Sequence, residues 1–108
     1  MCGISGILNL RATNTPPKEE ELTRMLAAIR YRGPDESGIY LGSNIGLGNV
    51  RLSILDLSTG QQPISVRQGR YWIVYNGELF NYIEIRRTLE AEGISFVTTS
   101  DTEVVLQA

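Results

Sequence analysis

Apolar and polar positions alternate with two different periods in the first part of the chain, and each period predicts one kind of element. Residues 3–10 mix small and apolar side chains, which indicates a buried strand. Residues 18–30 begin with glutamates that the helix dipole favours, and then place apolar side chains at helical spacing: Leu22, Met25, Leu26 and Ile29. Asn14, Thr15 and two prolines predict the start and cap of this helix, and Gly33-Pro34 its end.

The rest of the chain predicts more strands and a second helix. Residues 32–42 indicate a turn and a short strand, residues 46–57 an apolar strand, and residues 58–69 a loop. The β-rich run that begins at Tyr71 breaks at Asn76-Gly77, a pair that readily adopts positive φ. A helix is then expected over residues 79–92, closed by Gly93, and a strand over residues 94–97.

The last segment carries a helix start without a helix end. Ser100-Asp101-Thr102-Glu103 matches a capping box, in which Ser100 caps the helix and Glu103 reaches back to the cap residue. Apolar residues follow, and the sequence stops at Ala108 with no C-cap. This pattern predicts the first part of a longer protein, with a short terminal helix as the alternative.

Composition narrows the class of protein. The chain has 108 residues, 42% of them hydrophobic, and a formal net charge of -2, which is typical of about one globular domain. Slight acidity without a basic block argues against a nucleic-acid partner, and no apolar run reaches the roughly 18 residues that cross a membrane. No secretory signal is evident, so we expect a cytoplasmic protein.

The absence of histidine is more informative. It excludes Ser-His-Asp and Cys-His arrangements within the chain, and together with the single cysteine it leaves no expected metal site. That cysteine, Cys2, directly follows Met1. A free thiol has a pKa of about 8.5, and an α-amine titrates at about 7.7–8.0. Removal of Met1 would therefore give Cys2 a base of its own, which predicts an N-terminal nucleophile.

Three other features could complete a site around this thiol. Asn76 and Gly77 could donate to an oxyanion, with a plain hairpin turn as the alternative. Arg51, inside an apolar segment, could clamp a substrate carboxylate or pair with an internal aspartate. Asp101 could stabilise the N-terminus of its helix, by capping it or through the helix dipole, or it could accept a substrate ammonium. These residue types together suit a pocket for an amino acid, although their spacing along the sequence does not by itself show that they converge.

Five segments resemble, in order, the N-terminal glutaminase domain of class II glutamine amidotransferases: MCGISGI, YRGPDESG, RLSILDLSTGQQP, YNGELFNY and TSDTEVVL. The resemblance covers essentially the whole chain. RGPD, RLSI-D-LS and QQP favour the branch of glutamine-hydrolysing asparagine synthetases. The implied fold class is α+β, an N-terminal-nucleophile αββα sandwich, of which residues 1–108 would form the N-terminal part.

The resemblance also implies roles for particular residues. Cys2 would be the nucleophile, and Asn76 and Gly77 would form the oxyanion hole. Arg51 would hold the α-carboxylate of glutamine, and Asp101 would hold its α-amino group. The remaining pocket residues would be Glu78 and the backbone around Leu52 and Ser53. The chain departs from the family at Tyr31 and Asn49, where histidine is common, which concerns fine positioning and not the class of reaction.

The implied reaction is hydrolysis of glutamine through a cysteine thioester, with the ammonia used to make asparagine from aspartate. No cofactor is expected in this chain. ATP and Mg²⁺ would belong to a synthetase domain, because the sequence has no P-loop and no Ser-Gly-Gly pyrophosphate loop. The expected partners are glutamine, that synthetase domain and, as an option, a second copy of the protein.

Two alternatives stay open at the level of sequence. The 108 residues alone are expected to be inactive, so the chain could be a truncated or non-catalytic module. It could also be a glutaminase that serves a carboxylate acceptor other than aspartate, because the acceptor site would belong to the absent domain.

Overall fold

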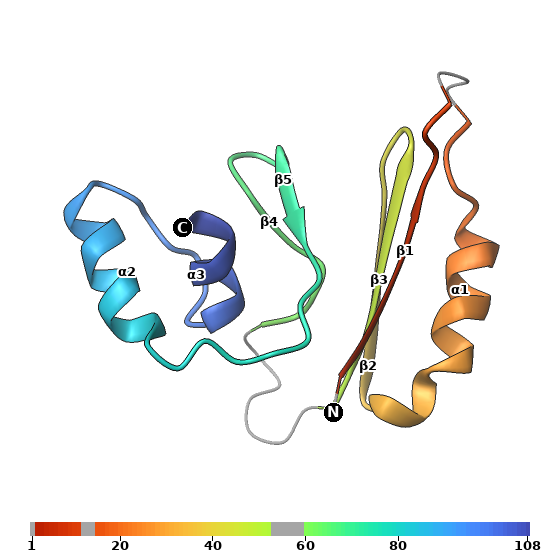
Figure 1. Cartoon of the computed structure of the whole chain (residues 1–108), viewed down its shortest axis with the longest axis horizontal. Coiled ribbons are helices and arrows are strands. Elements are labelled where there is room, and N and C mark those ends of the chain that lie inside the picture. Colours follow the sequence, from red (N-terminus) through yellow and green to blue (C-terminus); the bar gives the residue numbers. More distant parts are fainter. Residues whose placement is uncertain (1, 12–14, 53–59) are drawn as a thin grey trace.

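The computed structural model describes residues 2–11, 15–52 and 60–108. Figure 1 shows these residues in two parts that lie side by side. The first part is a three-stranded sheet with one long helix, and the second is a two-stranded sheet with two helices. Both sheets are antiparallel, so the structure has the mixed α+β class that the sequence predicts.

The sheet of the first part has the strand order β1-β3-β2. Strand β1 spans Gly3–Leu8, β2 spans Glu36–Leu41 and β3 spans Ile45–Arg51. The predicted strand over residues 46–57 is confirmed up to Arg51, and residues 53–59 lie outside the described part of the chain. Helix α1, Glu19–Ala28, covers one face of this sheet (Figure 1), and a 3-10 turn, η1, follows at Arg30–Arg32.

Helix α1 packs closely because β3 presents glycines to it. Leu22 is fully buried and Leu26 nearly so. A Cβ on Gly46 would come within 2.6 Å of a Leu22 methyl group, and a Cβ on Gly48 within 3.0 Å of Leu26. The buried side chain of Val50 completes this small core, at the end of β3 that leads to Arg51.

The second part contains an element that the sequence pattern missed. Strands β4, Ile64–Val66, and β5, Tyr71–Ile73, form a hairpin. Strand β5 confirms the start of the β-rich run predicted at Tyr71, whereas β4 lies inside the segment predicted to be a loop over residues 58–69. The loop prediction was wrong for residues 64–66, because Ile64 and Val66 alternate with an exposed serine and bury their side chains. Helices α2, Tyr82–Ala91, and α3, Asp101–Gln107, complete this part.

The predicted strand over residues 94–97 was also wrong. This segment is irregular, and Val97 is 95% exposed. The backbone N–H of Val97 and that of Thr98 donate to the carboxylate of Glu103, at 2.9 and 2.6 Å. The side chain of Glu103 thus provides the hydrogen bonds that a neighbouring strand would otherwise have provided.

The helix ends follow the sequence in part. Ser100 caps α3, because its Oγ accepts a hydrogen bond from the N–H of Thr102 at 3.1 Å. The reciprocal bond from Glu103 to the cap residue was predicted wrongly, since Glu103 binds residues 97 and 98 instead. Gly93 closes α2 at a φ of +94°, as expected. The N-cap of α1 is Lys18, not the predicted Asn14-Thr15 pair, of which Asn14 lies outside the described residues.

We expect the substitution Ser100→Ala to lower the free energy of unfolding by about 1 kcal/mol, because the N–H of Thr102 loses its acceptor. Urea unfolding followed by circular dichroism measures this change. Ser95→Ala is the matched control, since the Ser95 side chain is exposed and makes none of the hydrogen bonds described. Equal midpoints for the two variants would contradict the capping role.

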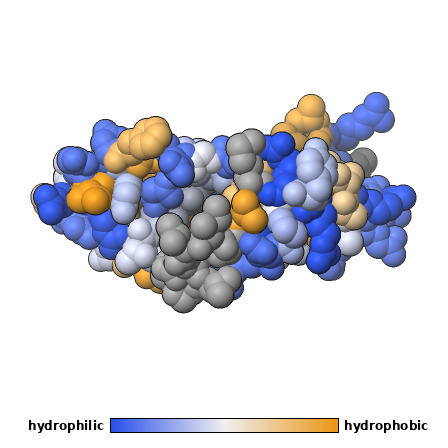
Figure 2. Space-filling model, turned by 90° about the horizontal axis from the view of Figure 1, so that it is seen from below, coloured by the Kyte–Doolittle hydropathy of each residue, from blue (hydrophilic) through white to orange (hydrophobic). Residues whose placement is uncertain are grey.

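One aromatic pair joins the two parts. Tyr40 of β2 stacks on Trp72 of β5, with ring centroids 3.8 Å apart and an angle of 13° between the planes. On the face shown in Figure 2, hydrophilic side chains predominate and the hydrophobic ones stand in separate small groups. Among the described residues, no helix is long and apolar enough to cross a lipid bilayer.

Candidate active site

A cavity of about 830 Å³ lies where the two parts of the fold meet. The first part contributes Cys2, Arg51 and Leu52, and the second contributes the segment after β5 and the start of α3. The cavity brings together all the residues predicted for the site that the structure describes: Cys2, Arg51, Leu52, Asn76, Gly77, Glu78 and Asp101. Ser53, also predicted, lies outside the described residues.

Cys2 is held although it stands next to the start of the chain. It immediately precedes β1, in which Gly3 pairs with Val50 of the central strand. The carbonyl oxygen of Cys2 accepts a hydrogen bond from Nε of Arg32 at 3.1 Å. Its thiol is free and half-buried at the cavity. Strand pairing therefore fixes the position of a residue that would otherwise fray with the terminus.

Arg51 ends β3 and forms an ion pair across the sheet. Its Nη1 lies 3.3 Å from Oε2 of Glu36, the residue directly opposite on β2. Both side chains are mostly buried, with 17% and 23% of their areas exposed. Of the two predicted roles, an internal ion pair is therefore present, but its carboxylate comes from a glutamate and not from the predicted aspartate. The guanidinium also lines the cavity, so the pair with Glu36 can orient it toward a ligand.

The segment before β2 holds both Cys2 and Arg51 in place. Besides the bond from Arg32 to Cys2, the N–H of Asp35 donates to the carbonyl of Arg51 at 3.2 Å. A Cβ on Gly33 would collide with the backbone of Arg51, so only glycine permits this close approach. The RGPD motif thus has a physical role, which is to fix two residues of the cavity relative to each other.

Asn76 and Gly77 follow β5 and are exposed at the cavity. Neither has a positive φ, contrary to the prediction, and they do not form a hairpin turn, because the next element is helix α2. A Cβ on Gly77 would lie 2.7 Å from the ring of Tyr75, so a larger residue there would displace this ring. The side-chain amide of Asn76 and the N–H of Gly77 lie beyond the β4–β5 pairing, and both residues line the same cavity as Cys2.

Asp101, the first residue of α3, connects the start of α3 to the segment that follows Asn76 and Gly77. Its Oδ2 accepts a hydrogen bond from the N–H of Leu79 at 2.9 Å. The carboxylate is half-buried and lines the cavity, where its role toward a substrate ammonium stays a prediction. Glu78 lies in the same segment and is exposed.

Gly60 lies between Arg51, at the end of β3, and Ser100, at the start of α3. It has a φ of +89°, and a Cβ built on it would lie 3.5 Å from Nη2 of Arg51 and 3.4 Å from Oγ of Ser100. Arg51 and the cap of α3 therefore flank the same glycine.

The two positions at which the chain departs from the resembled family differ in burial. Tyr31 is 81% exposed on η1, whereas Asn49 is 1% exposed within β3 and donates weakly to the carbonyl of Gly3 at 3.4 Å. Neither residue lines the cavity that holds Cys2. Within the described residues, no cluster of acidic, cysteine or histidine side chains could hold a metal ion.

Sequence reasoning missed two residues that organise the cavity. Glu36 orients Arg51, and Gln62 binds the backbone just before Asn76. Both belong to motifs that carry the family resemblance, but no local pattern indicates their partners, which lie 15 and 13 residues away in sequence. Only the pairing of the strands and loops brings them into contact.

Comparison with known proteins places the chain in a family that suits this cavity. The family profile described as "Glutamine amidotransferase domain" matches residues 1–108, and the chain belongs to this family. It is 46% identical to glutamine-hydrolysing asparagine synthetase 1 of Bacillus subtilis over 107 residues, 98% of this chain and 17% of the relative. It is 38% identical to asparagine synthetase B of Escherichia coli over 108 residues, 98% of this chain and 19% of the relative.

A relative with a different name is equally similar. The chain is 41% identical to amidase chry2 of Gibberella zeae over 117 residues, 98% of this chain and 17% of the relative. The chain thus spans less than a fifth of the length of each of these relatives.

Proposed function

We propose that the chain forms the glutamine-binding part of a glutaminase, which in the full-length protein hydrolyses the side-chain amide of glutamine with Cys2 as an N-terminal nucleophile after removal of Met1. This proposal rests on one observation. The same cavity holds the chain's only thiol together with Arg51, Asn76, Gly77 and Asp101. The family of the chain supports the same reaction.

The chemistry begins with the α-amine of Cys2, which takes the proton of the neighbouring thiol. The thiolate attacks the side-chain amide carbon of glutamine, a C–S bond forms, and the carbonyl electron pair moves to oxygen. The amide of Asn76 and the N–H of Gly77 stabilise this oxyanion. Its collapse breaks the C–N bond, and the amine proton leaves with ammonia. Water then hydrolyses the γ-glutamyl thioester to glutamate and regenerates the thiol.

The remaining residues hold the amino-acid end of the substrate. Arg51, oriented by Glu36, binds the α-carboxylate with the two parallel donors of its guanidinium. Asp101 keeps one oxygen on Leu79 and offers the other to the α-ammonium. Glu78 and the backbone of Leu52 and Ser53 complete the pocket. No group in this proposal requires a cofactor.

We further propose that the chain is the first part of an αββα glutaminase domain in a longer cytoplasmic protein. Its ammonia would serve asparagine synthesis from aspartate, with ATP and Mg²⁺ bound in a synthetase domain beyond these residues. The names of the Bacillus and Escherichia relatives support this acceptor. The Gibberella relative is named an amidase and not an asparagine synthetase, so a carboxylate acceptor other than aspartate stays a second candidate. Product analysis of the full-length protein with aspartate and other acids distinguishes the two.

The first residue of an active preparation tests the mechanism. We expect intact mass and N-terminal sequencing of the full-length protein to show Cys2 as the first residue, because only then does the amine lie on the same residue as the thiol. A diazo-ketone analogue of glutamine should label this Cys2. Glutamate formation by a protein that retains Met1 would refute the proposed base.

Arg51→Lys tests the binding of the α-carboxylate. A lysine ammonium cannot present two parallel donors, so we expect KM for glutamine to rise about tenfold or more, with a smaller change in kcat. Steady-state glutaminase assays measure both constants. Arg24→Lys, an exposed position on α1, is the matched control and should leave both unchanged. A fall in kcat at constant KM would assign Arg51 to the chemical step instead.

A further inference from the structure

Gln62 makes a paired contact with the backbone of Tyr75. Its Nε2 donates to the carbonyl of Tyr75 at 3.1 Å, and the N–H of Tyr75 donates to its Oε1 at 2.5 Å. The side-chain amide thus satisfies both backbone groups of one residue, as a neighbouring strand would. Strand β5 ends at Ile73, so Tyr75 lies beyond the ladder of the hairpin, and Gln62 supplies the partner that no strand provides there.

The backbone of Gln62 is itself fixed against the first sheet. A Cβ on Gly38 of β2 would collide with the carbonyl of Gln62 and come within 3.0 Å of the ring of Pro63. The segment that carries Gln62 therefore lies directly on the first sheet. In this sheet β1 begins just after Cys2, and β3 ends at Arg51. Gln62 connects this sheet with the second part of the fold, and it lines the cavity between them.

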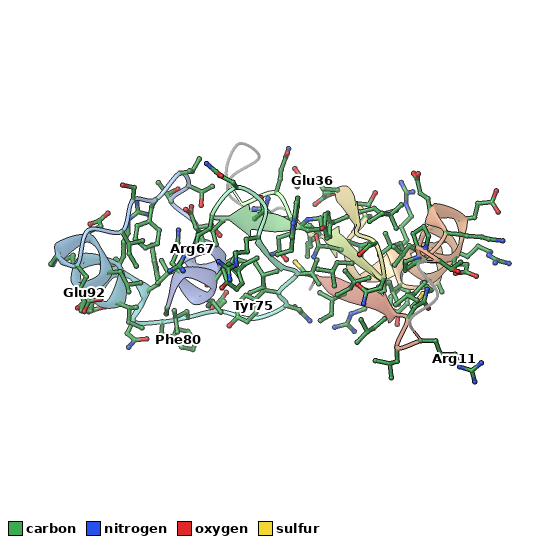
Figure 3. The ribbon with its side chains drawn as sticks, turned by 90° about the horizontal axis from the view of Figure 1, so that it is seen from above. Arg11, Glu36, Arg67, Tyr75, Phe80 and Glu92 are labelled. Carbon is green, nitrogen blue, oxygen red and sulfur yellow. The ribbon has the colours of Figure 1, made fainter. Side chains whose placement is uncertain are left out.

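The backbone of Tyr75 determines where the proposed oxyanion donors lie. Asn76 and Gly77 follow it directly, and the ring of Tyr75 occupies the space that a Cβ of Gly77 would need. Figure 3 shows Tyr75 near the middle of the molecule, where the two parts meet. A small displacement of the Tyr75 backbone would thus move both donors relative to the thiol of Cys2.

We propose that Gln62 is a positioning residue, which holds Asn76 and Gly77 at the distance from Cys2 that the oxyanion requires. This inference rests on the proposed glutaminase function. Gln62 does not touch the reacting atoms in this account. It acts through Tyr75, and its effect is confined to the transition state, where the donors take up the developing charge.

The substitution Gln62→Leu in the full-length protein is the first test. We expect kcat for glutamine hydrolysis to fall about 10- to 100-fold, because a displacement of about 1 Å costs a factor of this size. KM should change less than about threefold, since Arg51 and Asp101 still hold the substrate. Gln61→Leu is the matched control, because Gln61 is exposed, makes none of the hydrogen bonds described and does not line this cavity.

A second measurement separates the oxyanion donors from the thiol. Iodoacetamide alkylates Cys2 by displacement of iodide at a saturated carbon, so no oxyanion forms. We expect the alkylation rate of the Cys2 peptide to be the same in Gln62→Leu and in the wild type. If alkylation slows by the same factor as hydrolysis, or if KM rises as much as kcat falls, the substitution has disturbed the whole cavity and the positioning role is refuted.

The substitution Gln62→Glu adds a readout that depends on pH. An ionised carboxylate accepts from the N–H of Tyr75 but cannot donate to its carbonyl, whereas a protonated carboxyl does both. We expect the ratio of variant to wild-type kcat to rise as the pH falls, and a constant ratio would contradict the two-bond contact. A wild-type protein that forms no glutamate refutes the proposed function itself. A wild type that turns over while Gln62→Leu is equally fast refutes only the inference about Gln62.

Discussion

Replacing Cys2 with alanine should lower glutamate formation from glutamine by about 10⁴-fold or more in the full-length protein. These 108 residues contain no other cysteine and no histidine, so none of them offers a second thiol or an imidazole in place of Cys2. The cavity and the substrate contacts of Arg51 and Asp101 stay in place, because Cys2 is held through its backbone carbonyl and through the strand that follows. A glutaminase assay with saturating glutamine measures the loss.

Ammonium provides the control for this variant. If the ammonia serves a synthetase domain, Cys2→Ala should retain synthesis from free ammonium while it loses synthesis from glutamine. Loss of both activities would indicate that the substitution has unfolded the domain. Full glutamine-dependent activity in the variant would contradict the role of Cys2.

Replacing Leu22 with alanine should lower the free energy of unfolding by about 3–5 kcal/mol. Leu22 is fully buried between α1 and β3, and one of its methyl groups fills the space that a Cβ of Gly46 would otherwise occupy. Gly46, directly beneath Leu22, has no side chain that could move into the cavity. This loss is a large share of a typical domain stability of about 5–15 kcal/mol.

Met25→Ala is the matched control on the same helix. Met25 is 38% exposed, so we expect its truncation to cost about 1 kcal/mol or less. Urea unfolding of both variants measures the difference. Similar losses for the two substitutions would mean that α1 does not pack on the sheet through Leu22. Because β3 ends at Arg51, we also expect Leu22→Ala to raise KM for glutamine near the unfolding midpoint of the variant.

The helices were predictable because their signals are local. The spacing of Leu22 and Leu26 in α1, Gly93 after α2 and the serine cap of α3 each involve residues one or two turns apart. The strands were less predictable, because a strand is defined by its partner. Residues 94–97 have an apolar pattern but no neighbouring strand, and Phe96 lies under the guanidinium of Arg86 at 4.5 Å.

Residues of the candidate site were predictable where the composition leaves few side chains that could do the chemistry. The absence of histidine singles out Cys2, and a charge in an apolar strand singles out Arg51. The ion pair of Arg51 with Glu36 and the contact of Gln62 with Tyr75 could not be predicted in this way, because each depends on how two distant segments meet. The αββα sandwich, the domain limits and the roles of the cavity residues stay predictions.

The stack of Tyr40 on Trp72 gives the protein a built-in optical probe. Trp72 is the only tryptophan of the chain, and its indole N–H also donates to the carbonyl of Gly69 at 2.8 Å. Among these 108 residues, tryptophan emission therefore reports how the β4–β5 hairpin lies on β2. Separation of the two sheets would shift that emission to longer wavelength, so ligand entry between them is open to a stopped-flow measurement without any added dye.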